Sequence, residues 1–505
     1  MTPAQDEGNP KLQTPNTKAE RDGRSGRNEA DGSPMKSISV VLCALFFASF
    51  GQAQQAWTRT CGGTGSDGAN SVQQTSDGGY IIAGYTGSFG AGDTDVYLVK
   101  TNASGDTLWT RTYGGTSFDE GWSVQQTSDG GYVIAGTTYS FGAGDCDVYL
   151  IKTDASGDTL WTRTYGGTNE DKGRSVRQTS DGGYIIAGYT CSFGAADYDV
   201  YLIKTNASGD TLWTKTYGRT NDDEGWSVQQ TSDGGYIITG TTASVGTGGW
   251  DVYLLKTNAS GDTLWTRTYG GMSYDYGSSV QQTSDGGYIV AGWTESFGAG
   301  GNDVYLVKTN ASGDTIWTRT CGGIHSDEGN SVLQTSDGSD IIVGETWSFG
   351  AGGEDVYLIE TDASGDTLWT RTCGGTSGDW ANSVQQTSDG GYIIAGVTAS
   401  FGAGGEDVYL IKTDANGSAV EEPSTPRVTN SRTGFRVEPN PFGAFAVVPG
   451  HETERFTLSD ISGRQVGISS GSRIGEGLAP GVYFVSPVAA PAMTHFRPLR
   501  VVKGE

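Results

Sequence analysis

WTRTYGGTSFDEGWSVQQTSDGGYVIAGTTYSFGAGDCDVYLIKTDASGDTL, residues 109–160, is one copy of a unit that repeats along most of this chain. Its leading tryptophan recurs every 52 residues, and the spacing never slips. Repetition at this period indicates one supersecondary unit that is stacked or arranged in a ring. Seven copies are marked by Trp57, Trp109, Trp161, Trp213, Trp265, Trp317 and Trp369.

Each unit contains four candidate strands joined by glycine-rich turns, which we place at 123–127, 132–138, 148–153 and 159–165 in this copy. The second and third are continuously apolar, which predicts strands buried on both faces. The fourth carries Thr and Arg, as expected of an outer edge. Four-stranded units of this length predict the blades of a β-propeller.

The two ends of the array predict a closed ring of seven blades. The chain enters at Ala56–Thr60, a fourth strand that lacks the first three, and leaves after Asp407–Thr413, a third strand that lacks a fourth. We therefore expect the N-terminal strand to complete the last blade, because closure removes the edges of an open array. The expected fold class is all-β: a seven-bladed propeller over 54–413, followed by a small β-sandwich.

The stretch Asp154–Trp161 resembles the tryptophan-docking motif of quinoprotein-type propellers. The resemblance implies that the seven repeated tryptophans interlock neighbouring blades. It does not extend to the quinone cofactor, because the vicinal cysteines and calcium-binding acids of those enzymes have no counterpart here. Thr75–Gly79 is a weaker match to the Asp box of sialidases, since Ile82 stands where an aromatic residue is expected, and we expect no sialidase activity.

Composition narrows the class of protein. The 81 glycines among 505 residues suit many tight turns, and the net charge of −26 argues against a nucleic-acid ligand. The cysteines form no CxxC or vicinal pair, so zinc and thioredoxin-like redox chemistry are not expected. Cys61, Cys321 and Cys373 occupy a slot that other repeats fill with tyrosine, which indicates packing.

The N-terminal region has the pattern of a secretory leader. Residues 36–53 read KSISVVLCALFFASFGQA, a lysine followed by an apolar run and small residues, with cleavage expected after Ala53. The run is too short to span a membrane, and we expect no transmembrane span in the mature chain. We assign 35–53 to the signal peptide and 1–34 to a disordered or mis-called extension.

The repeat stops near Lys412, and 414–432 is rich in Gly, Ser, Pro and Thr, which predicts a linker. Short strands with Gly and Pro turns follow, including Phe435–Phe442 and Gly477–Val485. This order of segments resembles the type A sorting domain of the type IX secretion system. The resemblance implies that 433–505 engages that machinery, at the outer-membrane surface or outside a Gram-negative bacterium; a generic sandwich domain is the alternative.

No catalytic, cofactor or metal site is predicted. The chain has no HExxH, GxSxG, P-loop or EF-hand motif, and its three histidines fall in non-equivalent places. The aspartates that recur in every blade, such as Asp95, Asp147 and Asp199, are expected to cap turns, with calcium binding as the alternative. We expect that the protein is not an enzyme.

A candidate ligand face follows from strand direction. Loops between strands two and three, and loops between blades, share one face, and they hold the positions that differ between copies. Aromatic residues gather there and suit a contact surface, with packing over neighbouring blades as the alternative. The candidates are Trp122, Trp226, Trp250, Tyr274, Tyr276, Trp347 and Trp380, accompanied by Phe118, Tyr139 and Tyr198.

Three functions remain open from the sequence. The first is a surface-displayed propeller that binds a glycan or a protein. The second is a structural surface or matrix module without a specific ligand. The third is a hydrolase or lyase that acts on polysaccharide on a propeller scaffold. Near-identical blades also fit recent duplication, in which case the differences between copies are drift.

Overall fold

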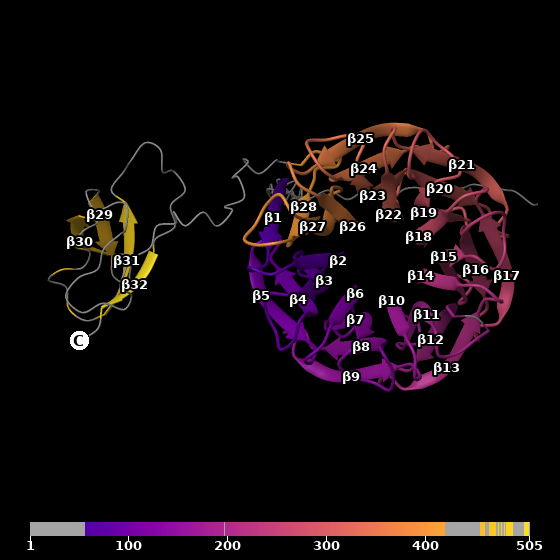
Figure 1. Ribbon diagram of the computed structural model, residues 1–505, viewed down its shortest axis with the longest axis horizontal. Coiled ribbons are helices and arrows are strands. Elements are labelled where there is room, and N and C mark those ends of the chain that lie inside the picture. Colours follow the sequence, from indigo (N-terminus) through magenta and orange to yellow (C-terminus); the bar gives the residue numbers. More distant parts are fainter. Residues whose placement is uncertain are drawn as a thin grey trace, which may run out of the picture. The chain divides into compact units, whose positions relative to one another are not determined.

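The computed structural model describes residues 56–195, 197–419, 455–459, 464–470, 473, 476, 479, 481–487 and 499–503. Within this part of the chain every regular element is a β-strand. Seven four-stranded antiparallel sheets form a ring, and each first strand lies nearest the central axis (Figure 1). The prediction of a seven-bladed β-propeller is confirmed.

The strands fall into blades in chain order. The first three blades are β2 (Asp67–Gln74), β3 (Tyr80–Thr86), β4 (Asp95–Thr101) and β5 (Thr107–Tyr113); β6 (Asp119–Gln126), β7 (Tyr132–Thr138), β8 (Asp147–Thr153) and β9 (Thr159–Tyr165); and β10 (Asp171–Gln178), β11 (Tyr184–Thr190), β12 (Asp199–Thr205) and β13 (Thr211–Tyr217). The fourth and fifth are β14 (Asp223–Gln230), β15 (Tyr236–Thr242), β16 (Asp251–Thr257) and β17 (Thr263–Tyr269); and β18 (Asp275–Gln282), β19 (Tyr288–Thr294), β20 (Asp303–Thr309) and β21 (Thr315–Cys321). The sixth is β22 (Asp327–Gln334), β23 (Asp340–Thr346), β24 (Asp355–Thr361) and β25 (Thr367–Cys373), and the seventh combines β26 (Asp379–Gln386), β27 (Tyr392–Thr398) and β28 (Asp407–Lys412) with β1 (Trp57–Cys61).

The first strand of each blade starts earlier than the sequence suggested. In the second blade it begins at Asp119, not at residue 123. The sequence did not predict this extension, because Gly114–Gly115 indicate a turn just before it. In addition, the Asp, Glu and Gly that open the strand have low β-propensity. The error matters for the site, because it moves four of the candidate aromatic residues from loops into strands.

The hydrophobic core lies between blades. One cluster joins Ile81 and Val96 of the first blade to Ile134 and Tyr149 of the second. Each middle strand therefore has an apolar neighbour on both faces, which explains why β7 and β8 are buried along their whole length. The outer strand β9 faces water and alternates between exposed and half-buried residues.

The repeated tryptophans lock each blade to the next. Trp109 packs on Gly157, in the third-to-fourth turn of the following blade, where φ is +79° and a Cβ atom would lie 2.7 Å from the indole. The hydroxyl of Tyr113 donates to the Gly157 carbonyl oxygen at 2.6 Å. The same contact recurs around the ring, ending with Trp369 against Gly417, so the blade contacts extend beyond β28. Only glycine satisfies both the positive φ and the close approach of the ring.

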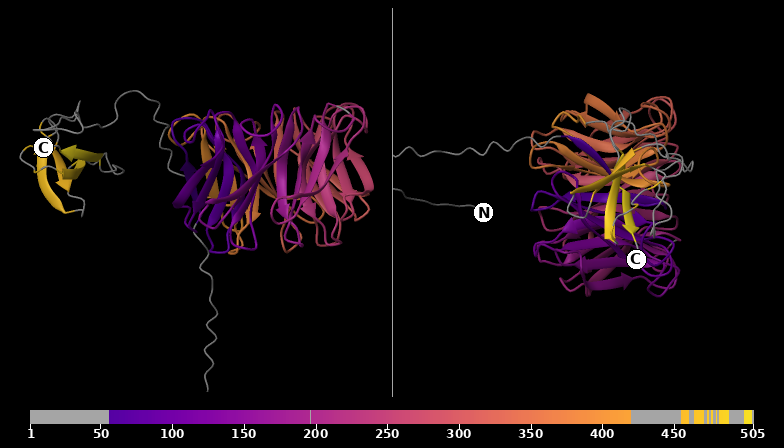
Figure 2. Two further views of the ribbon diagram at one scale, coloured as in Figure 1. Left: turned by 90° about the horizontal axis from the view of Figure 1, so that it is seen from below. Right: turned by 90° about the vertical axis from the view of Figure 1, so that its left-hand side faces the viewer.

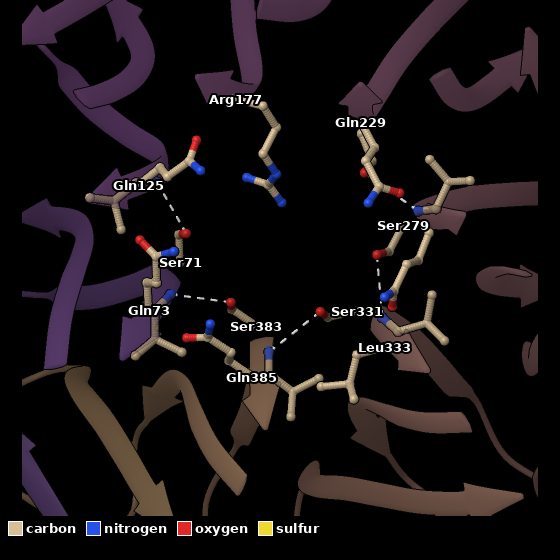
Figure 3. A pocket seen from close by; sticks show the side chains of 17 residues that line it. Ser71, Gln73, Gln125, Arg177, Gln229, Ser279, Ser331, Leu333, Ser383 and Gln385 are labelled. Carbon is tan, nitrogen blue, oxygen red and sulfur yellow. Dashed lines mark hydrogen bonds between the residues drawn. The ribbon is translucent and has the colours of Figure 1, made fainter. Parts of the chain in front are cut away.

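The inner edge of the ring is closed by side chains. In every blade a serine Oγ accepts a hydrogen bond from the backbone N–H of a valine in the next blade, as Ser71 does from Val124 at 3.1 Å and Ser383 from Val72 at 3.2 Å (Figure 3). Glutamines two residues after these serines act in the same way. For example, Gln125 Oε1 accepts a hydrogen bond from the backbone N–H of Gln178 at 2.6 Å. These bonds occupy donors that the first strands would otherwise leave without a partner.

The strands run between the two faces of the ring, so its loops collect at two rims (Figure 2). In the C-terminal region the described strands are β29 (Arg455–Ser459), β30 (Gln465–Ser470), β31 (Gly481–Pro487) and β32 (Leu499–Lys503), which form one sheet in the order β30-β29-β31-β32. The expected signal peptide at 35–53, the Phe435–Phe442 segment and most of the 414–432 linker lie outside the described residues. The described part contains no apolar helix of membrane-spanning length.

Candidate ligand-binding site

A β-bulge in every first strand turns one side chain toward the central channel. In β10 the pairing with β11 shifts between Gly173 and Ser175, which leaves Arg174 as the extra residue. The same shift recurs in all seven blades. Bulges re-aim side chains, and here they build a ring with a cavity of about 160 Å³. The bulged residues are Asn70, Trp122, Arg174, Trp226, Ser278, Asn330 and Asn382.

One arc of this ring is aromatic and cationic. The Arg174 guanidinium carbon lies 3.9 Å from the ring centroid of Trp122 and 4.4 Å from that of Trp226. Arg174 Nη2 donates to the Tyr189 hydroxyl at 3.2 Å. Stacking a guanidinium between two indoles contributes about 0.5–2 kcal/mol for each ring. The arc is therefore an aromatic and cationic break in the sevenfold pattern of the bulge ring.

The opposite arc is small and polar. Asn70 Nδ2 donates to the Gly121 carbonyl at 3.0 Å, and Asn382 Nδ2 donates to the Ala69 carbonyl at 2.9 Å. Asn330 makes the equivalent bond to Ala381. These asparagines hydrogen-bond neighbouring blades to one another and make the same contact in each case. The asymmetry of the channel therefore comes from the Trp–Arg–Trp arc.

Below the bulge ring, the channel encloses a cavity of about 270 Å³ lined mainly by Ser, Gln and Val (Figure 3). Arg177 is the charged residue of this lining and stands where five of the other blades have Gln and one has Leu333. Most of the polar groups here are engaged in the bonds between blades described above. We therefore assign the interior of the channel to the scaffold.

A second pocket opens on the variable face between the second and third blades, with a volume of about 450 Å³. Trp122 and Arg174 line both this pocket and the cavity at the bulge ring. Phe118 and Tyr139 stand at its rim, 50% and 44% exposed, with ring centroids 6.5 Å apart in an edge-to-face contact. Its lining is Phe118, Glu120, Trp122, Thr137, Tyr139, Lys172 and Arg174.

Charges around this pocket are largely balanced by neighbours. Lys172 Nζ lies 2.5 Å from Glu170 Oε1, and the hydroxyls of Tyr139 and Tyr198 donate to the same carboxylate. Partial burial would raise the pKa of Glu170, but the hydrogen bond from Lys172 holds it below its usual range. Burial raises the pKa of Glu224, although the positive charge of Arg174 acts to lower it.

The predicted aromatic residues do not form one continuous platform. Trp122 and Trp226 meet through Arg174 and lie in strands, as do Tyr276 and Trp380, so the prediction that these four occupy loops between blades is wrong. Tyr276 is stacked between Trp250 and Trp293, with centroids 5.9 Å and 4.2 Å away. Tyr274 and Trp347 are exposed, at 45% and 50%.

Sequence reasoning missed Arg174, Glu120 and Thr137. For Arg174 the signal was present as a column that differs in character between copies, one residue before the conserved Ser-Val, in which Trp122 and Trp226 were already singled out. A strand register without a bulge would not send that column toward the channel, so its role was not apparent.

The recurring aspartates cap turns, as expected. Asp95 Oδ2 accepts from the N–H groups of Ala91 and Gly92 at 2.7 and 3.2 Å. A group of acids on the sixth blade includes Glu345, whose pKa is raised to about 8 by burial and by Glu328 and Glu354. Within the described residues, no three His, Cys, Asp or Glu side chains are placed to hold a metal ion.

Fold and site together define a seven-bladed β-propeller whose sevenfold pattern is broken on one face. Residues 283–315 match a β-propeller domain of unknown function, DUF5122. The chain is also 27% identical over 252 residues to the regulatory protein FlaEY of Caulobacter vibrioides; the match covers 43% of this chain and 25% of that protein. It thus spans about a quarter of the length of this relative.

Solved structures resemble the chain at low identity. PorZ, a surface component of the type IX secretion system of Porphyromonas gingivalis, is 12% identical with a TM-score of 0.40, over 85% of this chain and 58% of that one. The polysaccharide lyase Uly1 is 12% identical with a TM-score of 0.44, over 74% and 94%. The strand pairing of the chain itself defines the seven four-stranded blades.

Proposed function

We propose that this protein is a binding propeller exported to the bacterial surface, and that its ligand binds on the face where the blades differ. The observation that carries the proposal is the concentration of aromatic differences between blades on that face. A residue that the ring requires is required in every blade, as the turn bond from Thr127 N–H to Gly131 O at 2.9 Å recurs from blade to blade. Residues that break the pattern on one face are not demanded by the fold.

The chemistry of that face supports binding. Exposed aromatic rings such as Tyr139, Tyr274 and Trp347 supply large contact areas with little conformational entropy to lose. The opposite face offers repeated Asp-Gly turns with the same hydrogen bonds in each blade, and it has no comparable variety. A ligand that recognises one part of the ring must therefore use the first face.

Binding is tested with the purified full chain on arrays of glycans and extracellular proteins. A variant with Tyr139→Ala, Tyr274→Ala and Trp347→Ala should lose most of its binding. The matched control is Leu108→Ala, Leu160→Ala and Leu212→Ala, three exposed apolar residues (57%, 58% and 57%) beside the turns of the other face. Equal binding by both variants would refute the proposal, as would the absence of any ligand.

Export forms the second part of the proposal and is supported by the leader pattern and by the C-terminal segments. A reporter protein with residues 35–53 at its N-terminus and residues 433–505 at its C-terminus should reach the surface of a bacterium that has the type IX system. It should stay in the periplasm when that system is deleted. Surface delivery without the system would overturn this part and leave the binding proposal intact.

A further inference from the structure

We propose that the pocket between the second and third blades binds a neutral sugar residue of a glycan. The inference rests on the proposed binding function and assigns a place and a ligand class to it. Three features of the pocket carry the argument: its unused hydrogen-bonding groups, its rim and its charge balance.

Three side chains that line this pocket have buried polar groups without a partner. The Thr137 hydroxyl, the Trp122 indole N–H and the Arg174 Nε–H and Nη1 groups are buried and have no hydrogen-bond partner among the described residues. Thr137 is only 2% exposed. Leaving a buried donor or acceptor unpaired costs about 1–3 kcal/mol, so such groups gathered around one cavity indicate partners supplied from outside.

The donors and acceptors suit a polyol. Trp122 and Arg174 can only donate, the Glu120 carboxylate can only accept, and the Thr137 hydroxyl can do both. Sugar hydroxyls also do both, so they can pair with donors and acceptors alike. The volume of about 450 Å³ lies in the range of small-ligand sites, roughly 300–1,000 Å³.

The rim provides apolar contact for a sugar. Phe118 and Tyr139 form an edge-to-face pair at the opening and are both about half exposed. Exposed aromatic rings pack against the C–H face of a pyranose, with the polar groups inside the pocket setting its orientation. This pair occurs in the second blade alone; the equivalent residues of the sixth blade are Ser326 and Trp347.

The charge balance favours a neutral ligand over an acidic one. Lys172 is paired with Glu170 at 2.5 Å, and Arg174 lies among Glu120, Glu224 and the aromatic rings. Among the described residues around the pocket, the cations Lys172 and Arg174 are matched by the carboxylates of Glu120 and Glu170, so the pocket carries no excess positive charge. The net charge of −26 also repels polyanions at long range.

The experiment titrates the full chain with three sets of oligosaccharides: neutral hexose oligomers, uronate oligomers and sulfated oligomers. Calorimetry and tryptophan fluorescence report binding at 50 and 500 mM NaCl. Neutral oligomers should bind with an affinity that salt hardly changes. Tighter binding of the uronate or sulfated oligomers, weakened by salt, would overturn the inference.

Two variants test the pocket. Thr137→Val keeps the shape of the side chain and should weaken binding of neutral oligomers by about tenfold, and Glu120→Gln should do the same. The matched control is Thr241→Val, since Thr241 is the equivalent residue two blades on, is also buried with an unpartnered hydroxyl, and lies outside the pocket. Circular dichroism confirms that each variant is folded.

The outcomes separate this inference from the proposed function. If the three-residue face variant loses binding while Thr137→Val, Glu120→Gln and Thr241→Val all match the parent, the inference fails and the binding face stands. If the face binds proteins but no neutral oligomer, the inference fails in the same way. If no ligand of any class binds, both fail.

Discussion

Trp57, in the first described strand, lies opposite Lys412 of the last propeller strand in the antiparallel pairing of β1 with β28. The pairing continues through Thr58–Ile411 to Cys61–Val408. The seventh blade is therefore built from both ends of the repeat region, and the ring is held shut by main-chain hydrogen bonds and by buried Trp57. Because β1 supplies a whole strand of the seventh blade, it is the natural place to test closure.

Removing β1 should open the ring. A chain that starts at Gly62 leaves the edge of β28 without its partner, and we expect the free energy of unfolding to fall by about 3–5 kcal/mol with dimers or aggregates forming through the bare edge. Light scattering and urea unfolding, compared with a chain that starts at Ala56, measure this. A synthetic peptide of residues 54–63 should restore the monomer, and a stable monomer without it would contradict the closure mechanism.

The docking tryptophans should differ in their contribution to stability. Trp161 packs on Gly209 and contacts Tyr184 at 6.0 Å, whereas Trp317 packs on Gly365 but faces Asp340 where other blades have tyrosine. We expect Trp161→Ala to lower the free energy of unfolding by about 3 kcal/mol and Trp317→Ala by about 1 kcal/mol less. Urea unfolding midpoints of the two variants measure this difference. Equal losses of unfolding free energy would show that the contact with tyrosine adds no stability.

The glutamine ring of the channel is interrupted at two places, and repairing one should stabilise the protein. Arg177 and Leu333 stand where the other blades have glutamine, and neither side chain can accept a hydrogen bond from the next blade. Arg177→Gln should raise the free energy of unfolding by about 1 kcal/mol by supplying that acceptor to Gln230. Gln125→Leu is the reverse control. It removes an existing hydrogen bond to Gln178 and should lower the free energy of unfolding.

Stability should fall as the pH rises from about 4 to about 7. Burial raises the pKa of Asp340 to about 7, compared with roughly 4 in an unfolded chain, so the folded state holds this proton more tightly. The contribution is complete below the unfolded pKa and is lost as the pH passes the folded pKa. Glu345, with a pKa raised to about 8, acts in the same direction.

Asp340→Asn is the variant that isolates this effect. At pH 8 it should be more stable than the parent by on the order of 2 kcal/mol, because it removes a buried charge, and at pH 4 the two should agree closely. Thermal unfolding from pH 4 to pH 8 measures both. A parent protein whose stability rises over this range, or a variant with the same pH profile, would contradict the assignment.

Much of the fold could be predicted because the repeat is expressed in local chemistry. The 52-residue spacing of the tryptophans, the doubly apolar second and third strands and the incomplete ends each follow from residues that are neighbours in the sequence. The start of the first strand could not be predicted in this way. Asp119 and Gly121 have low β-propensity and are held in the strand by pairing with Thr138 and Gly136.

By itself the sequence determined the number of blades, their strand order and the face on which copies differ, because every copy must meet identical neighbours and so repeats whatever the ring requires. Only the tertiary structure decided which of the differing residues work together. Trp122, Arg174 and Trp226 come from three blades, and they meet because a bulge in each first strand turns their side chains toward the channel. Contact between residues of different blades depends on ring geometry, and no local pattern encodes it.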